Sequence, residues 1–98
     1  MTVQHDAANH RFSVRLPEGS GNLYYRKLPS GGMDLYRTEV DPGLRGKGVA
    51  GELTTAAVGY AREHDIPVKA SCAYVAGWLK RHPAEGALRD HVRSLSAR

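Results

Sequence analysis

A glycine-rich basic turn near the middle of the chain has the residue types best suited to binding an anion. Residues 39–50 read Glu-Val-Asp-Pro-Gly-Leu-Arg-Gly-Lys-Gly-Val-Ala. Gly46 and Gly48 permit positive φ angles and the close approach of another group, and Arg45 and Lys47 add two cations. A helical pattern follows, and the first N–H groups of a helix are unpaired at the positive end of its dipole. The stretch therefore predicts a phosphate-binding turn.

Two familiar phosphate sites are not expected at this turn. The chain has no Gly-x-x-x-x-Gly-Lys-Ser/Thr run, which excludes a P-loop. Residues 46–51 have the spacing Gly-x-Gly-x-x-Gly, but in a dinucleotide-binding Rossmann site this run follows a strand directly, whereas residues 41–45 separate it from the strand predicted at 33–40. A plain strand-to-helix loop with two solvated cations stays open as the alternative.

The composition is that of an ordinary globular protein. The chain has 98 residues, of which 41% are hydrophobic and 24% charged, and we expect one domain over residues 1–98 with residues 1–8 and 94–98 loose. An edge strand within residues 1–9 stays open as the alternative for the first segment. The net charge of +4 suits an anionic partner without identifying it. With a single cysteine, no signal-peptide pattern and no apolar run of about 20 residues, we expect a cytoplasmic protein without a membrane segment.

The elements that must position the turn follow from hydrophobic periodicity. Three strands, at residues 11–16, 23–28 and 33–40, are predicted to form an antiparallel meander with turns at 17–22 and 29–32. On the third strand, strict alternation assigns Met33, Leu35, Arg37 and Glu39 to one face and Asp34, Tyr36, Thr38 and Val40 to the other.

The second half of the chain changes to a helical period. A helix is predicted from Lys47 to about His64, which would cap its C-terminus. A fourth strand at residues 68–72 pairs in parallel with the third, and helices follow at 74–81, ended by His82, and, with a weaker pattern, at 84–97. The order β-β-β-α-β-α predicts an α+β (mixed α/β) sheet domain.

The run Arg45-x-x-Gly48-x-Ala50 resembles the Arg/Gln-x-x-Gly-x-Gly/Ala signature of the GNAT superfamily of acyl-CoA-dependent N-acyltransferases. The chain is also similar to the small single-domain GNAT-like proteins of the YjdJ type through Arg11-Phe12 and residues 38–42, 44–48, 70–75 and 81–83. The resemblance covers residues 9–88.

The resemblance implies a GNAT-like fold, with an antiparallel β-meander followed by α-β-α and a central splayed sheet. The co-substrate would be acetyl-CoA or another acyl-CoA, lying in the cleft where the third and fourth strands splay apart, without a metal. The residues implied to bind it are Glu39, Val40, Arg45, Gly46, Lys47, Gly48, Val49, Ala50, Cys72, Tyr74 and His82.

Two residues are candidates for catalysis. Glu39 is a carboxylate able to take a proton from an acceptor ammonium, with an ion pair to Arg37 or Arg26 as the alternative role. Cys72 is placed near the acyl thioester by the resemblance and is a candidate nucleophile or general base, provided that its pKa is lowered. Its alternative role is that of a small buried hydrophobe. The five histidines lack the spacing of a metal site.

These observations favour an acyl-CoA-dependent N-acyltransferase that acetylates an unidentified amine, either a small molecule or a protein tail. A non-catalytic module that binds CoA or another anion is the alternative, because Arg37 stands where relatives often carry a histidine, and arginine cannot act as a base. Nucleic-acid binding has only the charge and an aromatic strand to support it, and we do not expect it.

Overall fold

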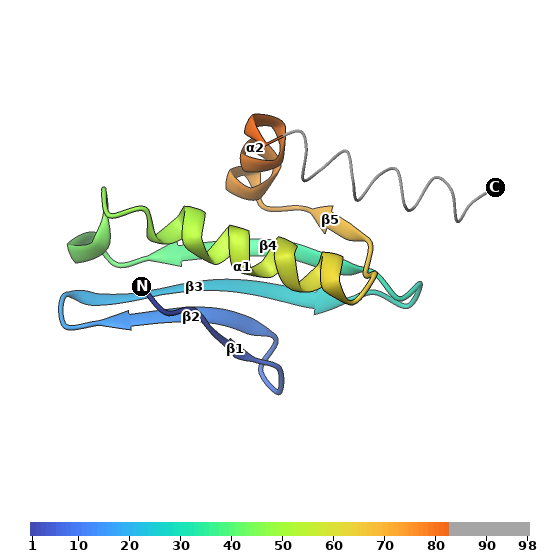
Figure 1. Ribbon diagram of the computed structural model, residues 1–98, viewed down its shortest axis with the longest axis horizontal. Coiled ribbons are helices and arrows are strands. Elements are labelled where there is room, and N and C mark those ends of the chain that lie inside the picture. Colours follow the sequence, from blue (N-terminus) through green and yellow to red (C-terminus); the bar gives the residue numbers. More distant parts are fainter. Residues whose placement is uncertain (83–98) are drawn as a thin grey trace.

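The fold is built from a sheet and two helices, seen in a computed structural model that describes residues 1–82 (Figure 1). The elements are, in order, β1 (Gln4–Asp6), β2 (Arg11–Leu16), β3 (Gly19–Lys27), β4 (Met33–Val40), a short 3₁₀ turn η1 (Pro42–Leu44), α1 (Val49–Glu63), β5 (Val68–Ala70) and α2 (Ala73–Arg81). The helix predicted at residues 84–97 and the loose segment predicted at 94–98 lie outside the described residues.

The sheet has five strands in the order β1-β2-β3-β4-β5. The first four are antiparallel neighbours, and β5 runs parallel to β4 after the helical crossover through α1. Figure 1 shows α1 lying along the sheet with α2 beyond the β4–β5 edge. The predicted mixed α+β class and the parallel pairing of the fourth predicted strand are confirmed.

One hydrophobic core lies between the sheet and the helices. It forms because alternate residues of the strands face the apolar side of α1 and α2. Its buried members are Phe12, Val14, Leu23, Tyr25, Met33, Leu35, Leu44, Val49, Leu53, Ala57, Val58, Ala61, Val75 and Trp78. Leu44 belongs to this core, so the turn that precedes α1 is anchored by its own side chain.

The predicted turn at residues 17–22 is shorter than expected, because β3 begins at Gly19 and pairs with β2 from the Leu16–Gly19 register onward. The polar and glycine residues of this stretch predicted a turn, but the packing of α1 against β3 places residues 19–22 in the strand. A Cβ on Gly21 would lie 2.7 Å from Cγ1 of Val49. A residue without a side chain is therefore needed where α1 crosses β3 most closely.

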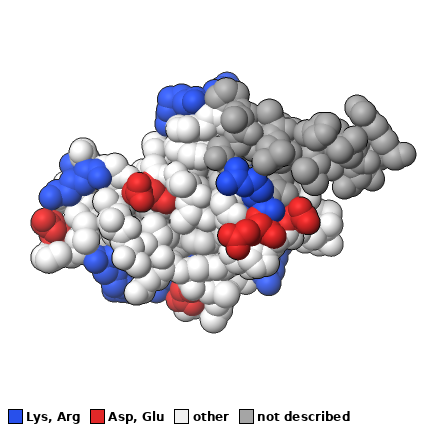
Figure 2. Space-filling view, in the orientation of Figure 1, with Lys and Arg blue, Asp and Glu red and all other residues white. Residues whose placement is uncertain are grey.

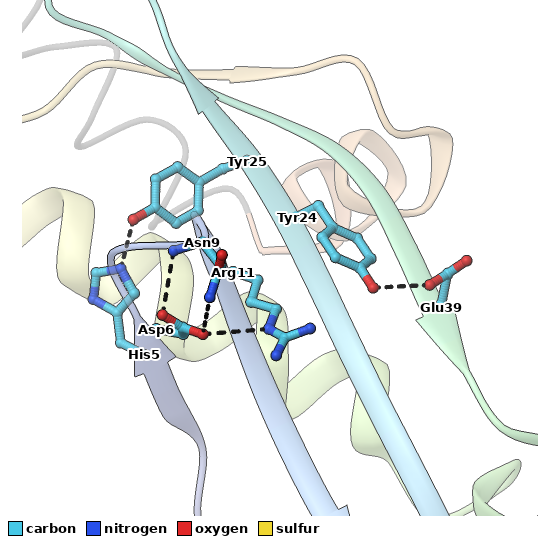
Figure 3. A network of polar contacts seen from close by, with 7 residues as sticks. All are labelled: His5, Asp6, Asn9, Arg11, Tyr24, Tyr25 and Glu39. Atoms are coloured by element: carbon cyan, nitrogen blue, oxygen red, sulfur yellow. Dashed lines mark hydrogen bonds and ion pairs between the residues drawn. The ribbon is translucent and has the colours of Figure 1, made fainter.

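The first residues of the chain form an edge strand, which confirms one of the two alternatives predicted for them. Gln4–Asp6 are paired with β2. His5 holds this strand in place, because its Nε2 lies 2.6 Å from the hydroxyl of Tyr25 (Figure 3). The His5 ring also stacks on Phe12, with 4.2 Å between the ring centroids. Asp6 contributes a second tie through its contacts with Asn9 and Arg11.

A β-bulge in β4 overturns the face assignment made from strict alternation. Tyr24 pairs with Arg37 and Tyr25 with Leu35, so Tyr36 has no partner residue in β3. An extra residue reverses the alternation beyond it. Arg37 and Glu39 therefore lie on the face away from the core, and Thr38 and Val40 lie on the face of Met33 and Leu35.

Both described helices end at a histidine, as predicted. His64 is the C-cap residue of α1, with Nδ1 2.9 Å from the carbonyl oxygen of Tyr60. His82 does the same for α2, with Nδ1 2.8 Å from the carbonyl oxygen of Trp78. Within residues 1–82, neither helix is long and apolar enough to cross a membrane.

Candidate functional site

The predicted phosphate-binding turn has the backbone geometry of an anion site. Gly46 and Gly48 have φ angles of 81° and 75°, whereas the φ of Lys47 between them is not positive. Alternation of this kind turns successive N–H groups toward one concave side. Gly48 is also the N-cap of α1, so the unpaired N–H groups of the first helical turn lie at the same place.

The turn is fixed against the β2–β3 hairpin. Asp41 N donates to the carbonyl oxygen of Ser20 at 2.9 Å, and Oδ2 of Asp41 accepts from Ser20 N at 2.8 Å. A Cβ on Gly43 would lie 2.4 Å from the carbonyl oxygen of Glu18, which shows how closely the turn approaches the hairpin. Together with the buried Leu44, these contacts hold the N–H groups in place before any ligand arrives.

The two cations of the turn have different environments. Lys47 Nζ lies 3.3 Å from Oε2 of Glu18, an exposed ion pair. The pKa of Glu18 is lowered, first by a backbone hydrogen bond within the residue and then by Lys47. Arg45 is exposed, and it lines the cavity described next. We therefore expect Arg45 to be the more available of the two for an anion.

A cavity of about 250 Å³ opens at the turn. Its lining residues are Val40, Leu44, Arg45, Gly46, Gly48, Val49, Ala50, Gly51 and Tyr74. A Cβ added to Gly46 or Gly48 would meet no atom within 4 Å, so open space adjoins the turn at both glycines. Unpaired backbone donors, an adjacent cation and open space fit a pyrophosphate group.

Between this cavity and Cys72 lies the part of β4 whose outer edge is not paired with any other described strand. The parallel register of β4 with β5 covers Met33 to Leu35 and ends there, although Cys72 N still donates to the carbonyl oxygen of Leu35 at 3.0 Å. Beyond this point β5 turns away toward α2 (Figure 1). This is the predicted splay between the third and fourth predicted strands.

The strand ladder decides which backbone groups face this opening. Asp41 bonds to β3, and alternate residues of an antiparallel strand bond to the same neighbour. The backbone groups of Thr38 and Val40 are therefore directed to the open side, and those of Glu39 are directed to β3. Of the two positions predicted to bind an extended ligand through the backbone, Val40 has the suitable orientation, and Thr38 joins it.

Cys72 lies where β5 gives way to α2. It is the N-cap residue of α2, and its Sγ is 3.4 Å from Oγ1 of Thr38. Burial alone would raise the pKa of the thiol, but the Thr38 side chain and the backbone N–H groups of Val75, Tyr74 and Thr38 outweigh it, so the pKa is lowered. A thiol at a helix N-terminus is a better nucleophile for this reason.

Glu39 lies on the other face of the sheet. The hydroxyl of Tyr24 donates to its Oε1 at 3.1 Å (Figure 3), and Arg37 forms an ion pair with its Oε2. The ion pair with Arg37 confirms one of the alternative roles considered for Glu39, whereas Arg26 pairs with Asp34. Because Thr38 and Glu39 are consecutive, the thiol and the carboxylate approach β4 from opposite sides.

The structure also places residues that sequence reasoning assigned elsewhere or missed. His82 stacks on Trp78 at 4.0 Å at the end of α2 and is not among the residues that line the cavity. Thr38 and Tyr24 contact the two candidate catalytic groups. Thr38 lies in one of the segments that carry the family resemblance, but sequence reasoning gave it no role, and no motif marked Tyr24. The bulge determines on which face of the sheet these side chains lie, and the alternation of residue types in the sequence does not reveal it.

Two observations bear on other classes of site. Among the described residues, no cluster of three or more His, Cys, Asp or Glu side chains is suited to hold a metal ion.

Figure 2 shows Lys and Arg interspersed with Asp and Glu on the face in view, rather than gathered into one basic patch. That face therefore lacks the electrostatic pattern typical of a nucleic-acid interface.

Comparisons with known proteins agree with this geometry. A family model described as GCN5-related N-acetyl-transferase matches residues 11–88. Protein NATD1 of Xenopus tropicalis and that of Mus musculus are each 34% identical over 83 residues, which covers 83% of this chain and 76% of the relative. Protein NATD1 of Homo sapiens is 32% identical over 83 residues, with 83% and 74% covered.

Proposed function

The chain belongs to the GCN5-related N-acetyltransferase family, and we propose that it transfers an acetyl group from acetyl-CoA to an amine. One observation carries this proposal. The N–H groups at Gly46 and Gly48 lie in a cavity that also has Val40 in its wall. From Val40 the unpaired edge of β4 leads to Thr38, which contacts Cys72. A ligand with a pyrophosphate at one end and a thioester at the other matches this path.

Acetyl-CoA supplies an activated acyl group, and the chain's own residues bind and orient it. The N–H groups of Gly46, Gly48, Val49 and Ala50, with the Arg45 guanidinium, would bind the pyrophosphate oxygens. The N–H groups of Arg45 and Lys47 already donate to the carbonyl oxygens of Pro42 and Leu44. The outward backbone groups of Val40 and Thr38 would hydrogen-bond the amide groups of the extended arm, as a neighbouring strand would. Tyr74 forms part of the cavity wall on the α2 side.

Glu39 is positioned to accept a proton from the acceptor. An ammonium must lose its proton before its nitrogen can attack a thioester carbonyl, and a carboxylate within reach takes that proton directly or through water. Glu39 is partly exposed on the face away from α1, and Tyr24 fixes one of its oxygens. The acceptor would therefore approach from the open face of the sheet, opposite the helices.

Cys72 offers a second route for the same transfer. Its thiolate would attack the thioester carbonyl, so that an S–C bond forms at Sγ and the CoA thiolate leaves. The neutral acceptor amine would then attack the new thioester, so that an N–C bond forms as the S–C bond at Cys72 breaks. The proton that the nitrogen loses would pass to water, and Cys72 would be left as the thiolate. The lowered pKa of Cys72 supports this route, because the thiolate is the attacking species.

A second candidate function is a binding module that holds CoA without transferring the acyl group. The ion pair between Arg37 and Glu39 favours it, because the guanidinium competes with an acceptor ammonium for the same carboxylate. In this case the cavity at Gly46 and Gly48 still binds CoA, and Glu39 has a structural role only. Turnover separates the two candidates.

The proposal extends to the cellular location, the kind of acceptor and the subtype of the protein. We propose a cytoplasmic location, because a lone cysteine with a lowered pKa is maintained as a thiol in a reducing compartment. The open face around Glu39 suits an amine on a protein tail as well as a small amine. Assignment to the YjdJ type stays a prediction.

Isothermal titration with acetyl-CoA and with CoA tests binding, and mass spectrometry of amine and lysine-peptide mixtures incubated with acetyl-CoA tests transfer. We expect saturable binding and a mass gain of one acetyl group on an acceptor. Binding without transfer across the panel would favour the CoA-binding module. Failure to bind at millimolar acetyl-CoA would exclude both candidates.

A further inference from the structure

We propose that Thr38 is a positioning residue that holds the Cys72 sulfur at the splay between β4 and β5 and stabilises it as a thiolate. The proposal depends on the proposed function only for its role in acyl transfer. The state of the thiol itself is open to measurement without any acyl-CoA. Thr38 lies in the segment 38–42 that carries part of the family resemblance, but the resemblance assigned it no role, and the bulge at Tyr36 sets the face on which it lies.

The side chain of Thr38 contacts the sulfur directly. Its hydroxyl oxygen lies 3.4 Å from Sγ of Cys72, within the distance of a hydrogen bond to sulfur. Thr38 belongs to the part of β4 beyond Leu35, where the register with β5 has ended. A strand residue thus offers a hydroxyl donor to a cysteine that is 34 positions later in the chain.

The N-terminus of helix α2 lies at the same sulfur. Cys72 is its N-cap residue, without a side-chain cap hydrogen bond. Burial raises the pKa of the thiol, but the Thr38 side chain and nearby backbone N–H groups outweigh it, so the pKa is lowered, because a donor near the sulfur favours the charged thiolate over the neutral thiol. The Thr38 hydroxyl is the side chain in contact with Sγ, so it is the group that a substitution removes.

This arrangement gives Thr38 a specific role in the proposed transfer. The sulfur is held at the vertex of the splay, where the path along β4 from the Gly46–Gly48 cavity ends. Without the hydroxyl, the thiolate would lose one donor, and the side chain of Cys72 would lose its contact with β4. The fraction of thiolate at neutral pH would then decrease, and attack on a thioester would slow in proportion.

The decisive experiment uses the fact that Cys72 is the only cysteine in the chain. Iodoacetamide alkylates the thiolate with release of iodide, and intact-mass spectrometry measures the rate between pH 5 and 10. Thr38→Val removes the hydroxyl and keeps the branched shape, whereas Thr38→Ser keeps the hydroxyl. We expect the midpoint of the profile to move to higher pH in Thr38→Val, with about tenfold slower alkylation at pH 6, and Thr38→Ser to follow the wild type.

Superimposable profiles of wild type and Thr38→Val, with both proteins folded by circular dichroism, would overturn the proposal. If Thr38→Val does not fold, the wild-type protein gives the answer by thiolate absorbance at 240 nm. Its midpoint in buffer must lie below its midpoint in denaturing urea, and equal midpoints would overturn the proposal. Neither measurement contains acetyl-CoA, so a failure here is distinct from a failure to bind or transfer the acyl group.

Discussion

The hydroxyl of Tyr24 lies 3.1 Å from Oε1 of Glu39, across the β3–β4 pair and on the face of the sheet away from α1. Arg37 occupies the other carboxylate oxygen. On the opposite face, the neighbouring Thr38 contacts Cys72. The candidate proton acceptor, Glu39, and the candidate nucleophile, Cys72, therefore lie on opposite faces of the same short stretch of β4.

The role of Glu39 is testable by an isosteric change. Glu39→Gln keeps a hydrogen-bond acceptor for Tyr24 but removes the base, so we expect kcat to decrease about 100-fold. The dissociation constant of acetyl-CoA, measured by titration calorimetry, should be unchanged because the cavity does not contain the Glu39 side chain.

Tyr24→Phe is the matched control for this substitution. It leaves the carboxylate in place and removes one hydrogen bond, so its effect on kcat should be much smaller than that of Glu39→Gln. Equal rates in Glu39→Gln and wild type would show that the carboxylate takes no proton in the transfer.

The two cations of the turn should differ in their effect on binding. Arg45→Ala is expected to weaken acetyl-CoA binding about tenfold, since it removes a charge-assisted contact with phosphate. Lys47→Ala should have the smaller effect, because Lys47 is paired with Glu18. Calorimetric titrations at two salt concentrations measure both effects.

Lys27→Ala supplies the control for charge alone, since Lys27 ends β3 and does not line the cavity at the turn. It should leave acetyl-CoA binding unchanged. If all three substitutions weaken binding equally, the effect comes from net charge rather than from the turn.

Two glycines should respond to alanine in opposite directions. In Gly21→Ala the new Cβ would lie 2.7 Å from Cγ1 of Val49, so we expect the free energy of unfolding to decrease by about 1–3 kcal/mol. Gly59 lies within α1 and has no atom within 4 Å of an added Cβ. Gly59→Ala should raise the free energy of unfolding by about 0.5–1 kcal/mol.

Urea unfolding followed by circular dichroism measures both changes. A neutral Gly21→Ala would mean that α1 does not approach β3 as closely as the structure shows. A destabilised Gly59→Ala would contradict the open space on that side of the helix.

His5 should make the stability depend on pH. Burial lowers the pKa of His5, and His64, His10 and Lys27 lower it further, although Asp6 acts in the opposite direction. The folded protein therefore binds a proton at His5 less readily than the unfolded chain, whose histidine pKa is about 6.5. Stability is fully present above this value and is lost as the pH falls through it toward the folded pKa.

Thermal melting at pH 7.5 and at pH 5 checks this dependence, with His5→Phe as the comparison because a phenyl ring keeps the stack on Phe12. We expect wild type to lose more stability than His5→Phe between these two pH values. Parallel losses in the two proteins would remove His5 as the cause.

Further loss near pH 4 is expected in both proteins, because the pKa of Asp6 is lowered, mainly by its hydrogen bond with Asn9.

Local patterns predicted the sheet strands well where side-chain alternation was regular. Residues 11–16 and 33–40 were predicted with the bounds of β2 and β4, because period-2 burial is visible in the residues themselves. The pattern failed at Gly19–Asn22, where small polar residues join β3. There, the need for space beneath α1 outweighs their low strand propensity.

The sequence by itself determined the order of the elements from β2 to α2, the glycine-rich turn that is predicted to bind phosphate and the resemblance to the acyltransferase family, because each depends on residues close together in the chain. The tertiary structure decided on which face of the sheet each candidate catalytic residue lies. A single unpaired residue, Tyr36, reverses the faces of β4 and separates Glu39 from Cys72. Long-range packing brings Thr38 and the N-terminus of α2 to the same sulfur, and contacts between residues 34 positions apart leave no local pattern to read.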